Sequence, residues 1–155
     1  MNIDAEGESL KPKSQRLKVV LELAERNEQA SMEVLSSKRQ YRDQQQEQLE
    51  HLQSYHVQYV HDMKKGMAGS QNVSNLQANL QFMNQVDIAI QQQEGVAESA
   101  QNAFNLALDE WKALHQKTKG MTDLITRYKN EELLLAEKKA QKQIEDDLQA
   151  RRLRR

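Results

Sequence analysis

Apolar side chains recur every three to four residues through most of the chain, and this spacing predicts long α-helices. The first helix is expected over residues 14–64, because no helix breaker occurs between Pro12 and the end of this range near Gly66. Ser14 is its expected N-cap, since its hydroxyl can accept a hydrogen bond from a backbone N–H of the first turn. Its predicted contact seam alternates steps of four and three residues: Leu17, Leu21, Ala24, Glu28, Ser31, Leu35, Lys38, Arg42, Gln45, Leu49, Leu52, His56, Tyr59 and Met63. The polar stretch from Lys38 to Gln45 is expected to pack most weakly.

A second helix is expected over residues 73–149. Its predicted seam comprises Leu76, Leu80, Met83, Asp87, Ile90, Glu94, Ala97, Gln101, Phe104, Leu108, Trp111 and His115. Past Thr118 the apolar stripe moves to Met121, Ile125, Tyr128 and Leu135, which we interpret as a slip of the heptad. Gly95 and Gly120 are expected to mark bends.

Between the helices, residues 65–72 contain the only closely paired glycines, Gly66 and Gly69, and are expected to form a turn. Gly66 is a candidate for the left-handed conformation at the end of the first helix. Residues 1–13 are expected to be a flexible lead-in, residues 14–149 a helical hairpin, and residues 150–155 a basic tail. At 1.5 Å per residue the helices would be roughly 75 Å and roughly 115 Å long, so the second outruns the first. The unpaired part would expose Leu133, Leu134, Leu135 and Ile144 to another molecule.

Composition agrees with a long antiparallel two-helix coiled-coil hairpin of the all-α class. Apolar residues make up 37% of the chain and charged residues 29%, which is too polar for an ordinary globular core but sufficient for a narrow seam. Disorder is the competing interpretation of such a polar chain, and the regular apolar spacing argues against it. Five glycines and one proline provide too few turns for a fold rich in strands.

Charge and sequence features set expectations about location. The chain contains no cysteine and no apolar run near the ~20 residues that cross a bilayer. The acidic start of the chain lacks the apolar core of a signal peptide. We therefore expect a cytoplasmic protein without direct membrane insertion. The net charge of −1 gives no support for nucleic-acid binding.

No arrangement of residues typical of an enzyme is found, so the chain is expected to be non-enzymatic, with no cofactor and no metal. His51, His56 and His61 recur every five residues, which turns successive rings about 140° apart around a helix, whereas a metal needs them on one face. The five residues from Arg151 to Arg155 include four arginines, interpreted first as a solvated helix end and second as a protein-binding segment.

A cluster on both sides of the turn is richer in aromatic side chains than a seam requires. Before the turn it comprises Gln48, Leu52, Tyr55 and Tyr59, and after the turn Phe82, Val86, Ala89 and Gln93. In an antiparallel hairpin these two sets lie side by side. Tyr55 and Tyr59 cannot both enter a two-helix seam, which predicts an exposed recognition patch. The alternative is that these side chains only thicken the seam.

The order and spacing of these tyrosines, the glycine-containing loop, Phe82, the stretch from Val86 to Ile90 and the single Trp111 resemble the FliJ family. The resemblance covers roughly residues 14–140. It implies a soluble stalk protein of the bacterial flagellar type III export apparatus, similar to the central stalk of rotary ATPases. The family carries leucine where this chain has Val86, and histidine where it has Gln93.

The resemblance also implies partners, namely a hexameric export ATPase, the cytoplasmic part of the export-gate membrane protein, and export chaperones. The surface that contacts the gate would correspond to Gln48, Leu52, Tyr55, Tyr59, Phe82, Val86, Ala89 and Gln93. Contacts with the ATPase ring are assigned to basic residues: Lys11, Lys13, Arg16, Lys18, Lys138, Lys139 and Lys142. The protein would lie at the cytoplasmic face of the inner membrane.

Two other functions remain open on the residues. One is a general coiled-coil chaperone or scaffold for unfolded export substrates, which would bind many unfolded chains and stimulate no ATPase. The other is a basic-tailed nucleic-acid binder, whose affinity would depend steeply on salt.

Overall fold

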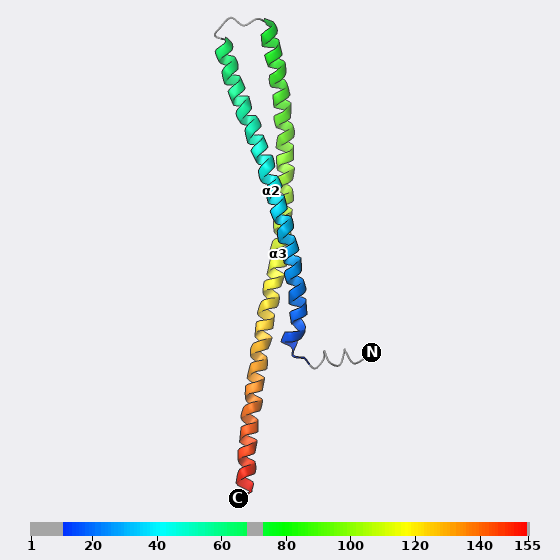
Figure 1. Ribbon diagram of the computed structural model, residues 1–155, viewed down its shortest axis with the longest axis vertical. Helices are drawn as coiled ribbons and strands as arrows, with labels where there is room; N and C mark the ends of the chain where they lie inside the picture. Colours follow the sequence, from blue (N-terminus) through cyan, green and yellow to red (C-terminus); the bar gives the residue numbers. More distant parts are fainter. Residues whose placement is uncertain (1–10, 68–72, 155) are drawn as a thin grey trace, which may run out of the picture. The chain divides into compact units, whose positions relative to one another are not determined.

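The computed structural model describes residues 11–67 and 73–154, which form two α-helices and contain no strand within those ranges. Helix α2 comprises Lys13–Met67 and helix α3 comprises Val73–Leu153 (Figure 1). The two helices pack against each other, so the predicted all-α two-helix hairpin is confirmed. Its coiled-coil character follows from the spacing of the buried positions described below.

The helix ends differ in detail from those predicted. Gly66 lies within α2 and has no positive φ, so the predicted left-handed cap at this residue is wrong. Helix α3 continues to Leu153 instead of ending near residue 149. The central part of the predicted turn, residues 68–72, and the lead-in over residues 1–10 lie outside the described residues.

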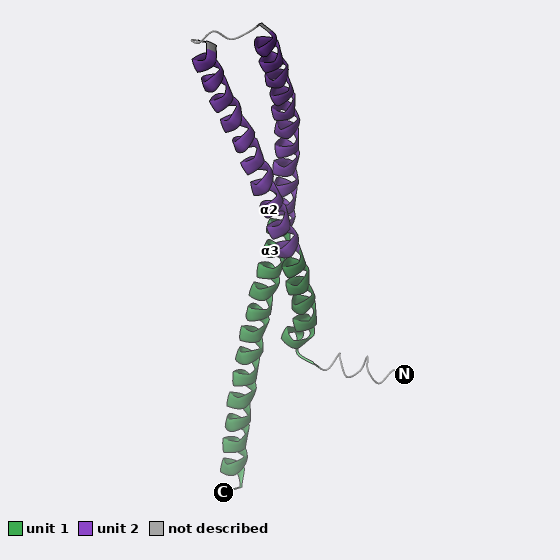
Figure 2. Ribbon diagram, turned by 45° about the horizontal axis from the view of Figure 1, so that its top comes forward, with its two compact units in different colours: residues 1–30, 112–155 green, residues 31–111 purple. Residues whose placement is uncertain are grey.

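The chain divides into two compact units (Figure 2). Unit 2 comprises residues 31–111, in which residues 31–67 of α2 lie beside residues 73–111 of α3 and run in the opposite direction. Leu35 and Phe104 are buried here with Ala107, and Leu108 and Trp111 pack around them. These residues form a hydrophobic core cluster of the unit.

Unit 1 comprises residues 1–30 and 112–155. Its described part pairs the beginning of α2 with α3 as far as Glu132, and every described residue of α3 after Glu132 is exposed. The α3 helix extends beyond the first turn of α2 in this unit (Figure 2). The expectation that the second helix outruns the first therefore agrees with the structure.

Ser14 is not the N-cap of α2, because the carbonyl oxygen of Pro12 already accepts the backbone N–H groups of Gln15 and Arg16 at 3.1 and 3.2 Å. Ser14 instead lies in the first turn and is only 4% exposed. Its backbone N–H donates to Oε1 of Glu132 at 3.1 Å, and its hydroxyl donates to Oε2 of the same carboxylate at 2.7 Å. A side chain from α3 thus satisfies an N–H that the helix itself leaves free.

The seam of α2 follows the prediction except at Lys38, which is exposed. On α3 the prediction is right at every second position. Of the others, Leu108 is partly buried and packs beside the seam, and the rest are exposed: Leu80, Asp87, Glu94, Gln101 and His115. The positions that line the seam of α3 alternate steps of three and four without interruption: Leu76, Asn79, Met83, Val86, Ile90, Gln93, Ala97, Ala100, Phe104, Ala107, Trp111, Leu114, Thr118, Met121, Ile125, Tyr128 and Glu132. Ala89, Ala103, Leu108 and Leu124 are partly buried beside them. There is accordingly no heptad slip after Thr118.

Candidate protein-binding surfaces

Three aromatic side chains form a cluster in unit 2. The ring centroids of Tyr59 and Phe82 are 5.0 Å apart, and Tyr55 lies 6.2 Å from Tyr59 and 6.3 Å from Phe82. The hydroxyl of Tyr59 donates a hydrogen bond of 2.8 Å to Oδ1 of Asn79. Tyr55 remains 50% exposed and Phe82 37% exposed. The cluster therefore holds two rings in place while leaving much of their surface accessible.

The other predicted members of this patch, which fall in the same unit, differ in their exposure. Gln48 is exposed, whereas Leu52 and Ala89 are partly buried. Val86 is only 8% exposed and packs in the seam, so it supports the surface from beneath and offers little area to a partner. Gln93 is also turned inward: its Nε2 donates to the backbone oxygen and to Oε1 of Gln45 at 3.0 and 2.9 Å.

Polar pairs across the seam were not predicted from the sequence. Besides the Gln45–Gln93 pair, Nε2 of His56 lies 2.9 Å from Oδ1 of Asp87. In unit 1, Nδ1 of His115 lies 2.7 Å from Oε1 of Glu28. The hydrogen bond from the His115 ring lowers the pKa of the Glu28 carboxyl, and the hydroxyl of Thr118 lowers it further against the opposing effect of desolvation.

The basic residues predicted to contact an ATPase ring all lie in unit 1. Lys11, Lys13, Arg16 and Lys18 are exposed. The Nζ atom of Lys13 lies 5.5 Å from the centre of the Tyr128 ring, a cation–π contact across the two helices. Together with Arg16 and Leu17, these two residues line a shallow hollow of about 270 Å³.

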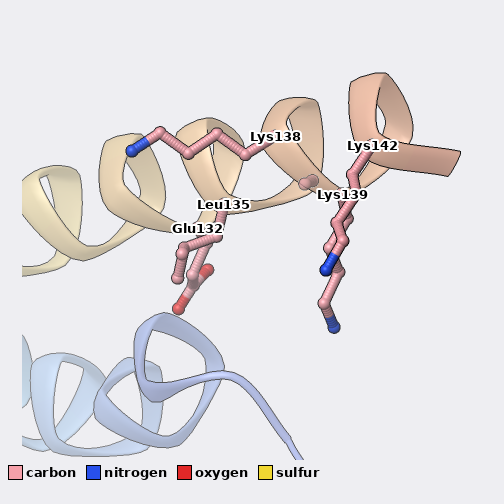
Figure 3. A pocket seen from close by; sticks show the side chains of 6 residues that line it. Glu132, Leu135, Lys138, Lys139 and Lys142 are labelled. Atoms are coloured by element: carbon pink, nitrogen blue, oxygen red, sulfur yellow. The ribbon is translucent and has the colours of Figure 1, made fainter. Parts of the chain in front are cut away.

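A second hollow, of about 470 Å³, lies just past the point where α2 begins (Figure 3). It is surrounded by the other three lysines predicted to contact the ring, Lys138, Lys139 and Lys142. Glu132 points toward the first turn of α2, and Lys142 extends from α3 on the same side, whereas Lys138 lies along another edge of the helix. The hollow is lined by Glu132, Leu135, Ala136, Lys138, Lys139 and Lys142. Lys139 and Lys142 occupy the continuation of the seam, so charge replaces apolar contact where the partner helix ends.

The final part of α3 also exposes large apolar side chains. Leu133, Leu134, Leu135 and Ile144 are each about 60% exposed, as expected from the sequence for the part of the second helix that extends beyond the described part of the first. Such a concentration of exposed leucine and isoleucine is typical of a surface that another protein covers.

Within the described ranges no group of acidic or histidine side chains is placed to hold a metal ion. In the same ranges, neither helix contains an apolar stretch that could span a lipid bilayer. The hollows are open to solvent and formed by side chains of one or two helices, so the geometry favours binding to other proteins over enclosure of a small substrate.

The two packed helices, without a strand in the described residues, place the protein in the class of all-α helical hairpins. Within that class the sequence identifies the family: the family model for the flagellar FliJ protein matches residues 13–155, and the chain belongs to this family. Membership makes the protein a component of the flagellar export apparatus. Neither the curated proteins nor the solved structures gave a match.

Proposed function

We propose that the protein is a non-enzymatic stalk of the flagellar export apparatus that binds two partners through separate surfaces. The aromatic cluster of unit 2 binds the cytoplasmic part of the export-gate protein, and the basic residues of unit 1 bind the hexameric export ATPase. By contacting both, the chain couples the ATPase to export at the cytoplasmic face of the inner membrane. It also receives and releases export chaperones.

The half-exposed pair Tyr55 and Phe82 carries the proposal for the gate. Aromatic rings that are already held by neighbouring rings lose little conformational entropy when a partner covers them, and they offer large apolar area. Both properties are characteristic of residues that dominate binding energy. Tyr59 contributes mainly by positioning these rings, because its hydroxyl is engaged with Asn79.

The gate proposal is tested with Tyr55→Ala and Phe82→Ala, each titrated against the purified cytoplasmic region of the gate protein. We expect binding at least tenfold weaker, because hot-spot aromatics contribute about 2 kcal/mol or more. Val57→Ala is the matched control, since Val57 is an exposed apolar residue of α2 in the same unit. It lies two residues from Tyr55 and from Tyr59, which places it on the opposite side of the helix from the aromatic cluster. Equal affinities for all three variants would exclude this surface, and circular dichroism would check that helicity is retained.

The ATPase proposal is tested with Lys139→Glu and Lys142→Glu, with Lys117→Glu as a control of equal charge change. Purified export ATPase is mixed with each variant, and hexamer formation and ATP turnover are measured. We expect the first two variants to stimulate assembly less than the control does. Stimulation that is the same for all three would remove these lysines from the interface.

A second candidate function is a general chaperone or scaffold for unfolded export substrates. The exposed Leu133, Leu134, Leu135 and Ile144 favour it, because unfolded chains bind to apolar surface. This function predicts binding to several unrelated unfolded polypeptides, reduced by Leu134→Gln, and no stimulation of the ATPase.

A further inference from the structure

Two members of the aromatic cluster, Tyr55 and Phe82, belong to a longer apolar face of unit 2. Its members recur every seven residues on each helix, just beside the seam: Val34, Tyr41, Gln48 and Tyr55 on α2, and Phe82, Ala89, Val96 and Ala103 on α3. We call these eight residues the lateral face. Val34, Tyr41 and Tyr55 are each about 50% exposed, and Phe82 and Val96 are each 37% exposed.

The antiparallel register brings the two sets of residues together. Because each step of seven along α2 is matched by a step of seven backward along α3, the contact between Tyr55 and Phe82 implies equivalent pairs further from the turn. The structure bears this out for Tyr41 and Val96, which line one hollow of about 330 Å³ together with Ala103. The lateral face is therefore continuous over four heptad positions.

The other side of the seam in the same unit is polar in its central part. The positions there are occupied by Arg39, Gln46 and Gln53 on α2, and by Asp87, Glu94 and Gln101 on α3, whereas the ends of the same two rows carry the apolar residues Met32, Val60, Leu80 and Leu108. Seven of the eight residues of the lateral face are apolar, with Gln48 as the exception. A hairpin that needed only solubility would carry polar side chains on both sides, so this asymmetry indicates a covered face.

The hollow beside Tyr41 has a floor of small residues. Gly95, Ser99 and Ala103 follow one another at intervals of four along α3. A methyl group placed on Gly95 would meet nothing within 4 Å, so the space above this residue is open. Small residues at this spacing allow the backbone of another helix to approach closely. Lys38 lies at the edge of the hollow and provides a positive charge.

We propose that the gate segment that contacts Tyr55 and Phe82 is an amphipathic α-helix, and that it continues along the lateral face as far as Val34. This inference rests on the proposed function, because it extends the same interface. The 21 residue-to-residue steps from Val34 to Tyr55 correspond to about 32 Å of helix, so the partner segment needs roughly 20 residues. Its apolar side chains face Tyr41 and Val96, and a carboxylate faces Lys38.

Affinity measurements separate this proposal from the one on which it rests. Tyr41→Ala and Val96→Gln are titrated against the purified cytoplasmic region of the gate protein, beside Tyr55→Ala and the control Val57→Ala. We expect about tenfold weaker binding for Tyr41→Ala and Val96→Gln and no change for Val57→Ala. If only Tyr55→Ala weakens binding, the interface is short and the extended helix is refuted while the gate proposal stands. If no variant weakens binding, both fail.

A photocrosslinking experiment locates the partner directly, because the chain has no native cysteine. Ser99→Cys and, on the polar side, Gln101→Cys are each labelled with benzophenone maleimide and irradiated with the gate region. The proposal predicts crosslinks from position 99 only, at gate residues spaced three or four apart. Crosslinks of equal yield from both positions would refute it. The proposal would also be refuted if position 99 formed crosslinks to another copy of this chain and none to the gate region, because a second copy would then occupy the face.

Discussion

The hydrogen bonds between Ser14 and Glu132 join the first turn of α2 to the last paired turn of α3. The perturbation that tests them is a double-mutant cycle of Ser14→Ala, Glu132→Ala and the combined variant. Ser14→Ala removes a hydroxyl that donates at 2.7 Å to a carboxylate, and Glu132→Ala removes both acceptors. The second change leaves a buried hydroxyl and a backbone N–H without their carboxylate partner.

The magnitudes follow from the type of bond. A hydrogen bond to a charged group contributes about 1.5–3 kcal/mol, and alanine regains about 0.5 kcal/mol of helix propensity over serine. Ser14→Ala should therefore destabilise the local structure by about 1–2.5 kcal/mol. Glu132→Ala should cost about 2–4 kcal/mol, because two donors lose their acceptors. The combined variant should cost less than the sum by about 1–2 kcal/mol, which is the coupling energy.

Native-state hydrogen exchange measures these effects where they occur. We expect the amides of residues 17–24 to exchange about tenfold faster for each 1.4 kcal/mol lost, while those of residues 31–63 keep their protection. Glu131→Ala is the matched control, because Glu131 is exposed and carries the same charge. A coupling energy below about 0.5 kcal/mol, or equal effects of Glu131→Ala and Glu132→Ala, would refute the reasoning.

Three further predictions concern stability. Gly120→Ala should raise the free energy of unfolding in urea by about 1 kcal/mol, because the added methyl group meets nothing within 4 Å and alanine favours the helix; an unchanged midpoint would contradict this. Leu35→Ala should lower it by about 2–5 kcal/mol, since Leu35 is buried against Phe104; a loss below 1 kcal/mol would show that the helices close the space. The His115 hydrogen bond lowers the pKa of Glu28. The contribution of this bond to folding stability is therefore complete above the ordinary carboxyl pKa near 4.5, and it disappears as the pH falls through the lowered pKa. Glu28→Gln should therefore show a smaller loss of thermal stability between pH 5 and pH 3, and an unchanged pH dependence would refute that assignment.

The sequence predicted the helices and the seam of α2 because large apolar residues mark half of the seam positions, at regular spacing on both sides of its polar middle. On α3 the sequence favoured Leu108 over its neighbour Ala107, whereas Ala107 is the more deeply buried of the two and Leu108 packs beside the seam. The structure places Phe104 in the seam and surrounds it with small residues, Ala100 and Ala107, which leave room for the ring and for Leu35. The correct choice depends on what the other helix places opposite, and no pattern within one helix contains that information.

The polar middle of the α2 seam shows the same limit. Arg42 was expected to weaken packing, but its guanidinium carbon lies 4.2 Å from the centre of the Phe104 ring and covers it. Gln45 accepts both hydrogen bonds from Gln93. The sequence brought together the residues of the aromatic cluster correctly, and it did not reveal that Gln93 is turned into the seam. Hydrogen-bond partners on different helices become visible only when the register is known.

The Gln45–Gln93 pair bears on the lateral face because it opposes a shift in register. Leucine at both positions would pack well in the seam, so Gln45→Leu/Gln93→Leu should be at least as stable as the original chain. The leucine variant should no longer specify one alignment of α2 against α3. An apolar seam also packs when one helix slides by seven residues, whereas paired polar groups then lose their partners. A short bismaleimide should join cysteines at 48 and 89 in the original register and cysteines at 48 and 96 after the slip. We expect the second crosslink only in the leucine variant. Its equal formation in the original chain would show that these glutamines do not fix the alignment on which the lateral face depends.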